Sequence, residues 1–189
     1  MTPSEIAARL PDYAQDLRRN FEQVLAEAGS PGLDRRQIAA VALASGIAAR
    51  YTGLSRALDA FAADVLDERE RCGVRAAAGT MGMTNIYYRF THLVSNREYA
   101  EMRFGLRTSV LQSPGIDRVS FELAALAVSA INGCGICVDA HERGLREHGM
   151  PIEGIQSAVR IAAVVHAVAV ILEQCVDAGQ DPHAGAGLQ

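Results

Sequence analysis

The sequence contains no Trp, and aromatic residues make up only 5% of its 189 residues. Hydrophobic residues nevertheless account for 49% of the chain, and alanine is abundant among them. A core with so few large rings has to be built from closely packed elements with small side chains at their contacts. No run shows the alternation of apolar and polar residues that half-buried strands require. We therefore predict an all-α fold.

Positive charge is also scarce. The net charge is −4 and no basic cluster stands out, which removes the electrostatic case for nucleic-acid binding.

The longest apolar run, Ile161 to Leu172, contains His166 and is about 12 residues long, shorter than the roughly 20 that a membrane span needs. Residues 1–5 lack the charged and apolar segments of a signal peptide. We expect a cytoplasmic protein without a membrane span.

Cysteine is limited to four residues. Because the cytoplasm keeps structural thiols reduced, these cysteines are not expected to form a disulfide scaffold. The close pair Cys134 and Cys137 then indicates either redox activity or metal binding. Cys72 and Cys175 are expected to be buried structural thiols, and His166 a core histidine.

Helical spacing and capping residues divide the chain into segments. The predicted helices are Ser4 to Leu10, a helix capped by Asp12, a helix from Asp34 to about Arg50, Leu54 to about Arg71, Val74 to Val94, Arg118 to Ile131, Cys134 to His148, and Pro151 to about Val176. Six apolar residues of the fifth helix are expected on its inner side: Met81, Met83, Ile86, Tyr87, Phe90 and Leu93. We expect the cluster of Met81, Met83, Tyr87 and Tyr88 to lie in the core or at a contact between subunits rather than in a cofactor site. We expect one domain over residues 1–178 and a disordered tail over 179–189.

Two stretches of the chain resemble each other. Leu33-Asp34-Arg35-Arg36 and Ile116-Asp117-Arg118-Val119 both precede an alanine-rich helix, at an offset of 83 residues. At this offset, four pairs of positions correspond: Ala39 with Glu122, Tyr51 with Cys134, Leu54 with Cys137, and Leu58 with His141. If the repeat is real, the first half is a structural copy without the chemistry.

The stretch Asn132 to His141 contains the chemistry. In a helix that starts at Cys134, His141 lies about 20° from Cys134 and about 40° from Cys137 around the axis, so all three side chains project from one side. The helix N-terminus favours a thiolate, and a histidine can accept the thiol proton. The second cysteine then resolves whatever the first one forms. Gly133 and Gly135 are expected to leave the sulfurs open to a substrate.

Glu122 is the only acid between Arg118 and Asp139, in an otherwise apolar helix. A buried carboxylate is unfavourable unless it is paired. Pairing with His141 would orient the imidazole and hold a proton for transfer. The alternative is a half-exposed acid in the first turn of a helix.

Other interpretations of the cysteine pair remain open. The two thiols can be small core residues, although Cys-Gly-x-Cys after Asn-Gly is not a typical core run. A zinc-binding interaction protein could use Cys134, Cys137 and His141, but the fourth ligand would have to come from Cys72, Cys175 or His148. Thiol redox chemistry requires no further residue.

The motif Glu122-(eleven residues)-Cys134-Gly135-Ile136-Cys137-(three residues)-His141 resembles the signature of the AhpD alkylhydroperoxidases, within the carboxymuconolactone decarboxylase-like superfamily. Residues 126–133, 81–89 and 160–165 are also similar, so the resemblance covers roughly residues 4–177. It implies a helical fold with two related halves, the second carrying the Cys-x-x-Cys pair, in a homotrimer. Lactone decarboxylases of the same superfamily do not require this pair, which argues against that activity.

The resemblance further implies an antioxidant thiol peroxidase with no bound cofactor. Such an enzyme reduces alkyl hydroperoxides and an oxidised AhpC-type peroxiredoxin. Its electrons come from dihydrolipoamide on a lipoylated acyltransferase, which lipoamide dehydrogenase reduces.

The resemblance also assigns roles to the residues. Glu122 acts through His141 and a water to deprotonate Cys137, which attacks the peroxide, and Cys134 closes the disulfide. The helix dipole alone would favour Cys134 as the attacking thiol, so the order stays open. Some family members have histidine immediately before the second cysteine. This chain has Ile136 there, at a position that tunes thiol acidity and reduction potential.

Overall fold

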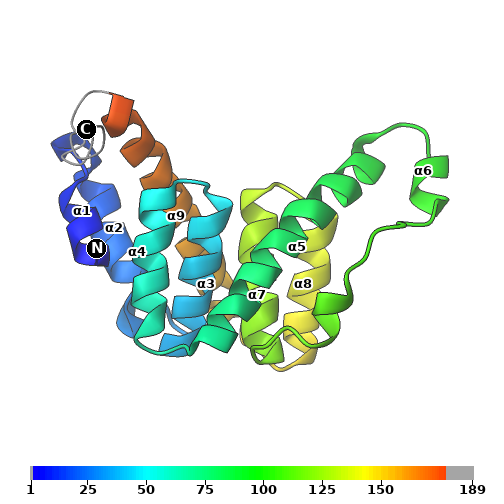
Figure 1. The fold of residues 1–189 in the computed structure, drawn as a ribbon, viewed down its shortest axis with the longest axis horizontal. Helices are drawn as coiled ribbons and strands as arrows, with labels where there is room; N and C mark the ends of the chain where they lie inside the picture. The colour runs from blue at the N-terminus through cyan, green and yellow to red at the C-terminus, as the bar shows by residue number, and fades with distance from the viewer. Residues whose placement is uncertain (1, 178–189) are drawn as a thin grey trace, which may run out of the picture.

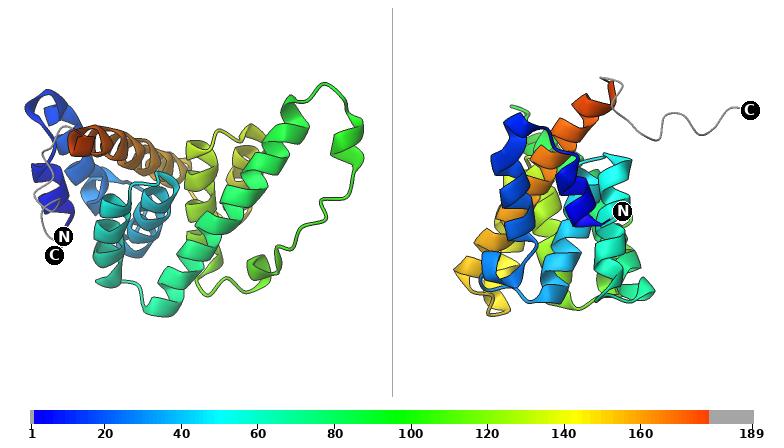
Figure 2. Two further views of the ribbon diagram at one scale, coloured as in Figure 1. Left: turned by 45° about the horizontal axis from the view of Figure 1, so that its top comes forward. Right: turned by 90° about the vertical axis from the view of Figure 1, so that its left-hand side faces the viewer.

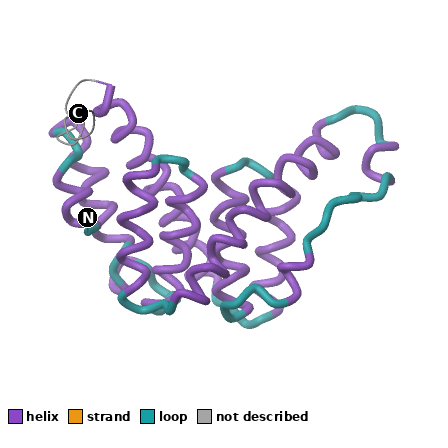
Figure 3. The backbone as a smooth tube through the Cα atoms, in the orientation of Figure 1, coloured by secondary structure: helices purple, strands orange, loops and turns teal. Residues whose placement is uncertain are grey.

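The computed structural model describes residues 2–177, and within this range the chain forms helices and loops with no strand (Figures 1 and 3). The all-α prediction is therefore confirmed. The predicted tail, 179–189, lies outside the described residues. The α-helices are α1 (Pro3–Ala8), α2 (Gln15–Val24), α3 (Arg35–Ala48), α4 (Thr52–Ala63), α5 (Glu68–Leu93), α6 (Glu98–Glu101), α7 (Arg118–Ile131), α8 (Gly135–Glu147) and α9 (Ile152–Asp177). Short 3-10 turns are η1 (Asp12–Ala14), η2 (Glu27–Gly29) and η3 (Ser109–Gln112).

Aspartates start three of the long helices. The side chains of Asp34, Asp67 and Asp117 each accept a hydrogen bond from a backbone N–H three residues further on. Such caps satisfy amides that have no partner inside the helix. The prediction of one helix from Leu54 to Arg71 was wrong, because α4 ends at Ala63 and the Asp67 cap starts α5. Asp12 is no side-chain cap either, since a 3-10 turn precedes α2.

The two halves of the chain repeat the same helices. Both α3 and α7 have 14 residues, and both α5 and α9 have 26. Helices α3 and α4 begin 83 residues before α7 and α8, as the sequence offset predicts. At the corresponding positions of the first half, Ala39, Leu54 and Leu58 are fully buried. The repeat is therefore structural, and core side chains occupy the places of the chemical groups.

Helices α3 and α7 pack against each other at the centre of the bundle, and α5 and α9 contact both of them. Their buried faces are rich in alanine, with Ala40, Ala44, Ala124 and Ala127 fully buried. Small side chains allow the helix backbones to approach closely, which explains how a chain without Trp fills its core. Helix α8 packs against α7 as well, so the ends of these two helices are fixed relative to each other.

Helix α9 covers the range predicted from the sequence, Pro151 to about Val176, but its apolar part is longer than the run Ile161 to Leu172. Ile152–Cys175 is long and apolar enough to cross a membrane by length and composition alone, at 24 residues and a mean hydropathy of 2.0. Half of its most apolar window is buried inside the molecule, however. Ile161, Val165 and Val168 are fully buried, and α9 packs on α2, α3 and α7. These features are those of a core helix.

Helix α5 extends beyond the bundle. Its last turns and α6 project away from the other helices, and residues 102–117 lead back to α7 (Figure 2). Ile86, Phe90 and Leu93 are 59%, 46% and 72% exposed, so the prediction that they lie on an inner side was wrong. Helical periodicity correctly places Met81 in the core but does not reveal where the partner helices end.

Candidate active site

The cysteine pair lies where α7 gives way to α8. The chain turns at Gly133, whose positive φ of 67° suits glycine, and Cys134 forms the N-cap of α8. The backbone N–H of Cys134 donates to the Ser129 carbonyl, 3.1 Å away. Cys134 and Cys137 are joined by a disulfide, with their Cα atoms 5.3 Å apart. Both sulfurs therefore lie within the positive field of a helix N-terminus, which favours a thiolate once the bond is reduced.

The two cysteines differ in their surroundings. Cys134 is fully buried, and Cys137 is 7% exposed. The expectation that the glycines leave both sulfurs open to a substrate was therefore wrong. Only Cys137 lines the adjacent cavity, because its position in the first turn of α8 directs it there. A substrate in the cavity would meet Cys137 first.

Glu122, which is buried, and His141, which is partly buried, form a pair between α7 and α8. Nδ1 of His141 lies 2.6 Å from Oε2 of Glu122, and a guanidinium nitrogen of Arg118 lies 2.6 Å from the other carboxylate oxygen, Oε1. Glu122 is 6% exposed, which rejects the alternative of a half-exposed acid. The structure thus brings together the four residues that the sequence singled out, Glu122, Cys134, Cys137 and His141.

The charge of Glu122 follows from its partners. Burial by itself would raise its pKa, but the hydrogen bond with His141 and the charges of His141, Arg118 and His148 outweigh it, so the pKa lies below its ordinary value. The carboxylate is therefore ionised at neutral pH and can only accept hydrogen bonds. Because Glu122 lies on α7, its carboxylate holds the His141 ring with Nδ1 facing α7.

The other ring nitrogen of His141 contacts a residue that sequence reasoning missed. Nε2 lies 3.2 Å from Sδ of Met81, which is 4% exposed on α5. Two more side chains direct donors at this sulfur, Thr84 with Oγ1 at 3.7 Å and Asn85 with Nδ2 at 4.0 Å. Met81 and His141 are 60 positions apart in the sequence, so no local sequence pattern indicated this contact.

Asn85 continues these contacts to the turn that carries Cys134. Its Nδ2 donates to Ser129 Oγ, and its Oδ1 accepts from Asn132 Nδ2, both at 3.0 Å. Arg89 donates to the carbonyl of Asn132 as well. Since Asn85 and Ser129 are buried, the bond between them is shielded from water, and the three bonds together hold the end of α7 against α5.

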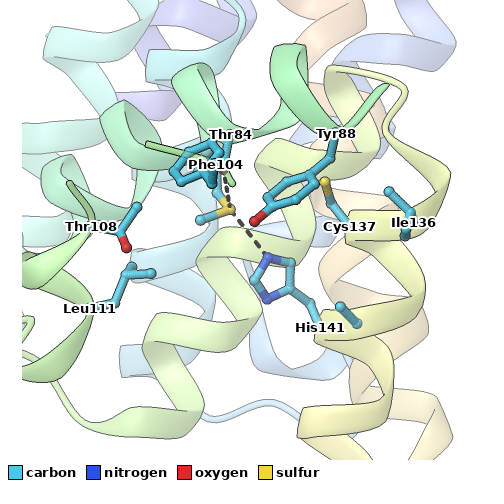
Figure 4. A pocket seen from close by; sticks show the side chains of 10 residues that line it. Thr84, Tyr88, Phe104, Thr108, Leu111, Ile136, Cys137 and His141 are labelled. Carbon is cyan, nitrogen blue, oxygen red and sulfur yellow. Dashed lines mark hydrogen bonds between the residues drawn. The ribbon is translucent and has the colours of Figure 1, made fainter. Parts of the chain in front are cut away.

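A cavity of about 340 Å³ opens beside Cys137 and His141 (Figure 4). Apolar and aromatic side chains form most of its wall, while Cys137, His141, the Tyr88 hydroxyl and two threonine hydroxyls supply the polar groups. The lining residues are Met81, Thr84, Tyr88, Phe104, Thr108, Leu111, Ile136, Cys137, Ala140 and His141. The rings of Tyr88 and Phe104 stack, with centroids 5.5 Å apart. The residues 102–117 that follow α6 thus complete a site that α5 and α8 begin.

Three other residues lie away from this site, in places the sequence did not predict. Cys72 is exposed and Cys175 is intermediate in exposure, so neither is a buried thiol. His166 is exposed rather than in the core. Within residues 2–177, no group of three or more His, Cys, Asp or Glu side chains is arranged to hold a metal ion.

A helical repeat that carries a buried dithiol beside a Glu–His pair defines a thiol redox site, and comparison with known proteins gives its family. The model of the carboxymuconolactone decarboxylase family matches residues 97–181. The alkyl hydroperoxide reductase AhpD of Rhodospirillum centenum is 45% identical over 183 residues, which cover 96% of each chain. The protein of the same name from Methylobacterium sp. is 49% identical over 173 residues, or 92% of this chain and 97% of the relative. The chain therefore belongs to the AhpD alkyl hydroperoxide reductases of this family.

Proposed function

We propose that this protein reduces alkyl hydroperoxides by cycling Cys134 and Cys137 between dithiol and disulfide. The observation that carries the proposal is the position of Cys137, whose thiol lines a largely apolar cavity together with His141. An apolar wall suits the alkyl part of a hydroperoxide, and the polar end of the cavity suits the reacting oxygens. The names of the relatives support the same activity.

Each of the four site residues has a role in the oxidative half of the reaction. Glu122 orients His141, which takes the proton of the Cys137 thiol. The Cys137 thiolate attacks the terminal peroxide oxygen, the O–O bond breaks, and the alcohol leaves with the proton from His141. Cys137 is now a sulfenic acid. Cys134 attacks its sulfur, water leaves, and the disulfide closes, so the peroxide has gained two electrons.

The reducing partners are proposed as well, and membership of the family supports the proposal. We propose dihydrolipoamide as the electron donor, carried by a lipoylated acyltransferase and regenerated by lipoamide dehydrogenase. Besides the hydroperoxide, we propose that an oxidised AhpC-type peroxiredoxin accepts electrons from the dithiol. We propose that this exchange takes place in the cytoplasm. These partners match a site with a dithiol, which exchanges two electrons with another dithiol without a bound cofactor.

We further propose that one helical domain assembles as a homotrimer. The projecting end of α5 and the residues after it leave large apolar side chains exposed, including Leu93 at 72% and Met102 at 62%. Exposed apolar patches of this kind mark contacts between proteins. Measuring the molar mass in solution by light scattering tests this assembly.

The activity is tested by coupling peroxide consumption to dihydrolipoamide and lipoamide dehydrogenase, with thioredoxin as a competing donor. Wild-type protein is expected to turn over with dihydrolipoamide, while Cys134→Ser and Cys137→Ser lose lipoamide-dependent turnover. Cys72→Ser, which changes an exposed thiol on α5, serves as the matched control and should be fully active. Full activity in either active-site variant would rule out the two-thiol reaction.

A further inference from the structure

Asn85 joins α5 to the turn between α7 and α8. Its side-chain Nδ2 donates a hydrogen bond to Ser129 Oγ, and its Oδ1 accepts one from Asn132 Nδ2, both at 3.0 Å. Nδ2 also lies 4.0 Å from Sδ of Met81, a weak acceptor for its second hydrogen. Asn85 is only 1% exposed, so water does not compete for these contacts. Because rotation of the amide would break both 3.0 Å bonds, the side chain has one preferred orientation.

Both partners of Asn85 belong to the segment that places Cys134. The backbone carbonyl of Ser129 accepts a hydrogen bond from the Cys134 N–H, 3.1 Å away. Asn132 is the C-cap of α7, and its carbonyl accepts a hydrogen bond from the guanidinium of Arg89 on α5. Ser129 is fully buried, and so is Cys134. Two side chains of α5 thus hold the backbone from the last turn of α7 to the first cysteine.

The first half of the chain has the same junction without these polar groups. Helix α9 packs on α3 in the first half as α5 packs on α7 in the second. Residues without a polar side chain stand at the three corresponding positions, found from the offset of 83 residues and from the first residues of α5 and α9: Gly46 for Ser129, Ala49 for Asn132 and Ala169 for Asn85. Packing of the junction therefore does not require the hydrogen bonds. They occur in the half that carries the cysteines.

The shape of this turn affects how readily the two thiols form a disulfide. Two thiols that are held close together have a high effective concentration toward each other, and this favours the disulfide. A tenfold fall in that effective concentration lowers the equilibrium constant for disulfide formation tenfold. For a two-electron couple, this change raises the reduction potential by about 30 mV. Contacts that hold the turn should therefore lower the potential.

We propose that Asn85 is a positioning residue that holds the turn between α7 and α8 in the shape of the closed disulfide, so that Cys134 stays beside Cys137 when both are reduced. The hydrogen bonds of Asn85 are present with the disulfide closed, so they favour this form over any reduced form in which the turn rearranges. In a reduced form that keeps the turn, they keep the effective concentration high. The role deepens the proposed function, and it rests on that function for the part that the disulfide plays in turnover.

In the proposed reaction, rapid closure protects Cys137. Its sulfenic acid has two fates. Cys134 can attack the sulfur, so that water leaves and the disulfide forms. Alternatively, a second hydroperoxide transfers an oxygen atom to the sulfur, its O–O bond breaks, an alcohol leaves and a sulfinic acid forms, which a dithiol does not reduce. A turn that holds Cys134 in place favours the first fate and keeps the enzyme active.

The test compares Asn85→Ala and Ser129→Ala with Ser157→Ala. All variants are made in protein whose Cys72 and Cys175 are replaced by Ser, so that the two cysteines of the site are the only thiols. Ser157, like Ser129, is a buried serine, and its Oγ donates to a backbone carbonyl 2.9 Å away in the loop before α3. Ser157→Ala is therefore the matched control for the loss of one buried hydrogen bond. Equilibration with dithiothreitol redox buffers measures the reduction potential.

The reduction potential should rise in the variants that loosen the turn. In Asn85→Ala, the equilibrium constant for disulfide formation should fall roughly tenfold, which corresponds to ~30 mV. In Ser129→Ala, it should fall roughly threefold, which corresponds to ~14 mV. The double variant should shift by less than the sum of the two, because Asn85 and Ser129 share one hydrogen bond. Ser157→Ala should lose thermal stability as Ser129→Ala does but keep the parent potential.

A kinetic readout uses an aryl disulfide that releases a coloured thiolate. The Cys137 thiolate attacks one sulfur of the reagent and releases the first arylthiolate. Cys134 then attacks the Cys137 sulfur, and the second arylthiolate leaves as the protein disulfide closes. In Asn85→Ala, the second release should slow roughly tenfold, while the first release changes less than about threefold.

An unchanged or lower potential in Ser129→Ala, or an equal rise in Ser157→Ala, would overturn the inference. An unchanged rate of the second arylthiolate release in both Asn85→Ala and Ser129→Ala would overturn it as well. The comparison of Ser129→Ala with Ser157→Ala decides the point even if Asn85→Ala does not fold. Neither readout uses a peroxide or a lipoyl group, so failure of the proposed function would be recognised separately in the turnover assay.

Discussion

Oε2 of Glu122, on α7, lies 2.6 Å from Nδ1 of His141, on α8. The two residues are 19 positions apart, and the turn through Gly133 and Cys134 brings their helices side by side. The pair therefore depends on the same turn that carries the dithiol. A change that loosens this turn should disturb proton transfer and thiol chemistry together.

Replacing Glu122 by Gln should destabilise the protein in a pH-dependent way. The pKa of Glu122 is lowered in the folded state, so its carboxylate stabilises the fold above the ordinary value of 4.5, and this contribution is lost as the pH falls through the folded-state pKa. We expect Glu122→Gln to lower the free energy of unfolding by about 1–3 kcal/mol at neutral pH. Urea unfolding of the disulfide form at about pH 7 and about pH 3 should show this difference shrinking in acid. A constant difference would contradict the assignment of the lowered pKa.

Replacing Arg118 by Met should have a much smaller effect. Its side chain is 53% exposed, so water screens its ion pair with Glu122, and such pairs contribute about 0–1 kcal/mol. We expect less than about a threefold change in peroxide turnover, with Arg19→Met on α2 as the control for a lost surface charge. A loss of turnover much larger than threefold would show that Arg118 does more than balance the carboxylate.

Introducing a histidine at Ile136 should raise the reduction potential of the dithiol. Ile136 is 47% exposed between the two cysteines, and a cationic ring there would stabilise the thiolate of the reduced form. About 1 kcal/mol of stabilisation corresponds to roughly 20 mV for a two-electron couple. Equilibration against dithiothreitol redox buffers measures the potential, and Ile152→His at the start of α9 is the control. An unchanged potential would show that the side chain between the cysteines does not tune the site.

Removing the Phe104 ring should change which hydroperoxides are used. Phe104 stacks on Tyr88 and lies edge-on to Tyr87, with centroids 4.8 Å apart in the second pair, so it forms the outer wall of the cavity. Phe104→Ala should raise KM for a bulky aryl hydroperoxide by about tenfold, or ~1.4 kcal/mol, with little change for hydrogen peroxide. Tyr99→Ala removes an aromatic ring outside the cavity and should leave both values unchanged. An equal effect of Phe104→Ala on both peroxides would indicate lost folding rather than lost selectivity.

Local sequence patterns predicted the long helices that carry the chemistry. Asp34 and Asp117 precede alanine-rich runs, and both cap the helices that follow, because capping depends only on residues within one turn. Helical spacing placed Cys134 at the start of α8, and the cost of an unpaired buried carboxylate suggested the pairing of Glu122 with His141. The Asp67 cap was missed because a charged run, rather than an apolar one, follows it.

The remaining features depend on contacts between distant segments. Met81 touches His141 across the bundle, and Phe104 reaches the cavity from the chain after α6. Neither contact follows from helical periodicity, which gives the side of a helix but not the residue opposite. The exposure of Cys72 and of Leu93 likewise depends on which stretch of α5 has a partner helix.

The pH dependence of Cys137 alkylation tests the central claim most directly. The measurement uses reduced protein in which Cys72, Cys134 and Cys175 are replaced by Ser, so that Cys137 is the only thiol. If Glu122 and His141 remove the Cys137 proton, the alkylation profile should move to higher pH by about one unit in Glu122→Gln and in His141→Gln. Identical profiles in the parent protein and both variants would contradict the relay.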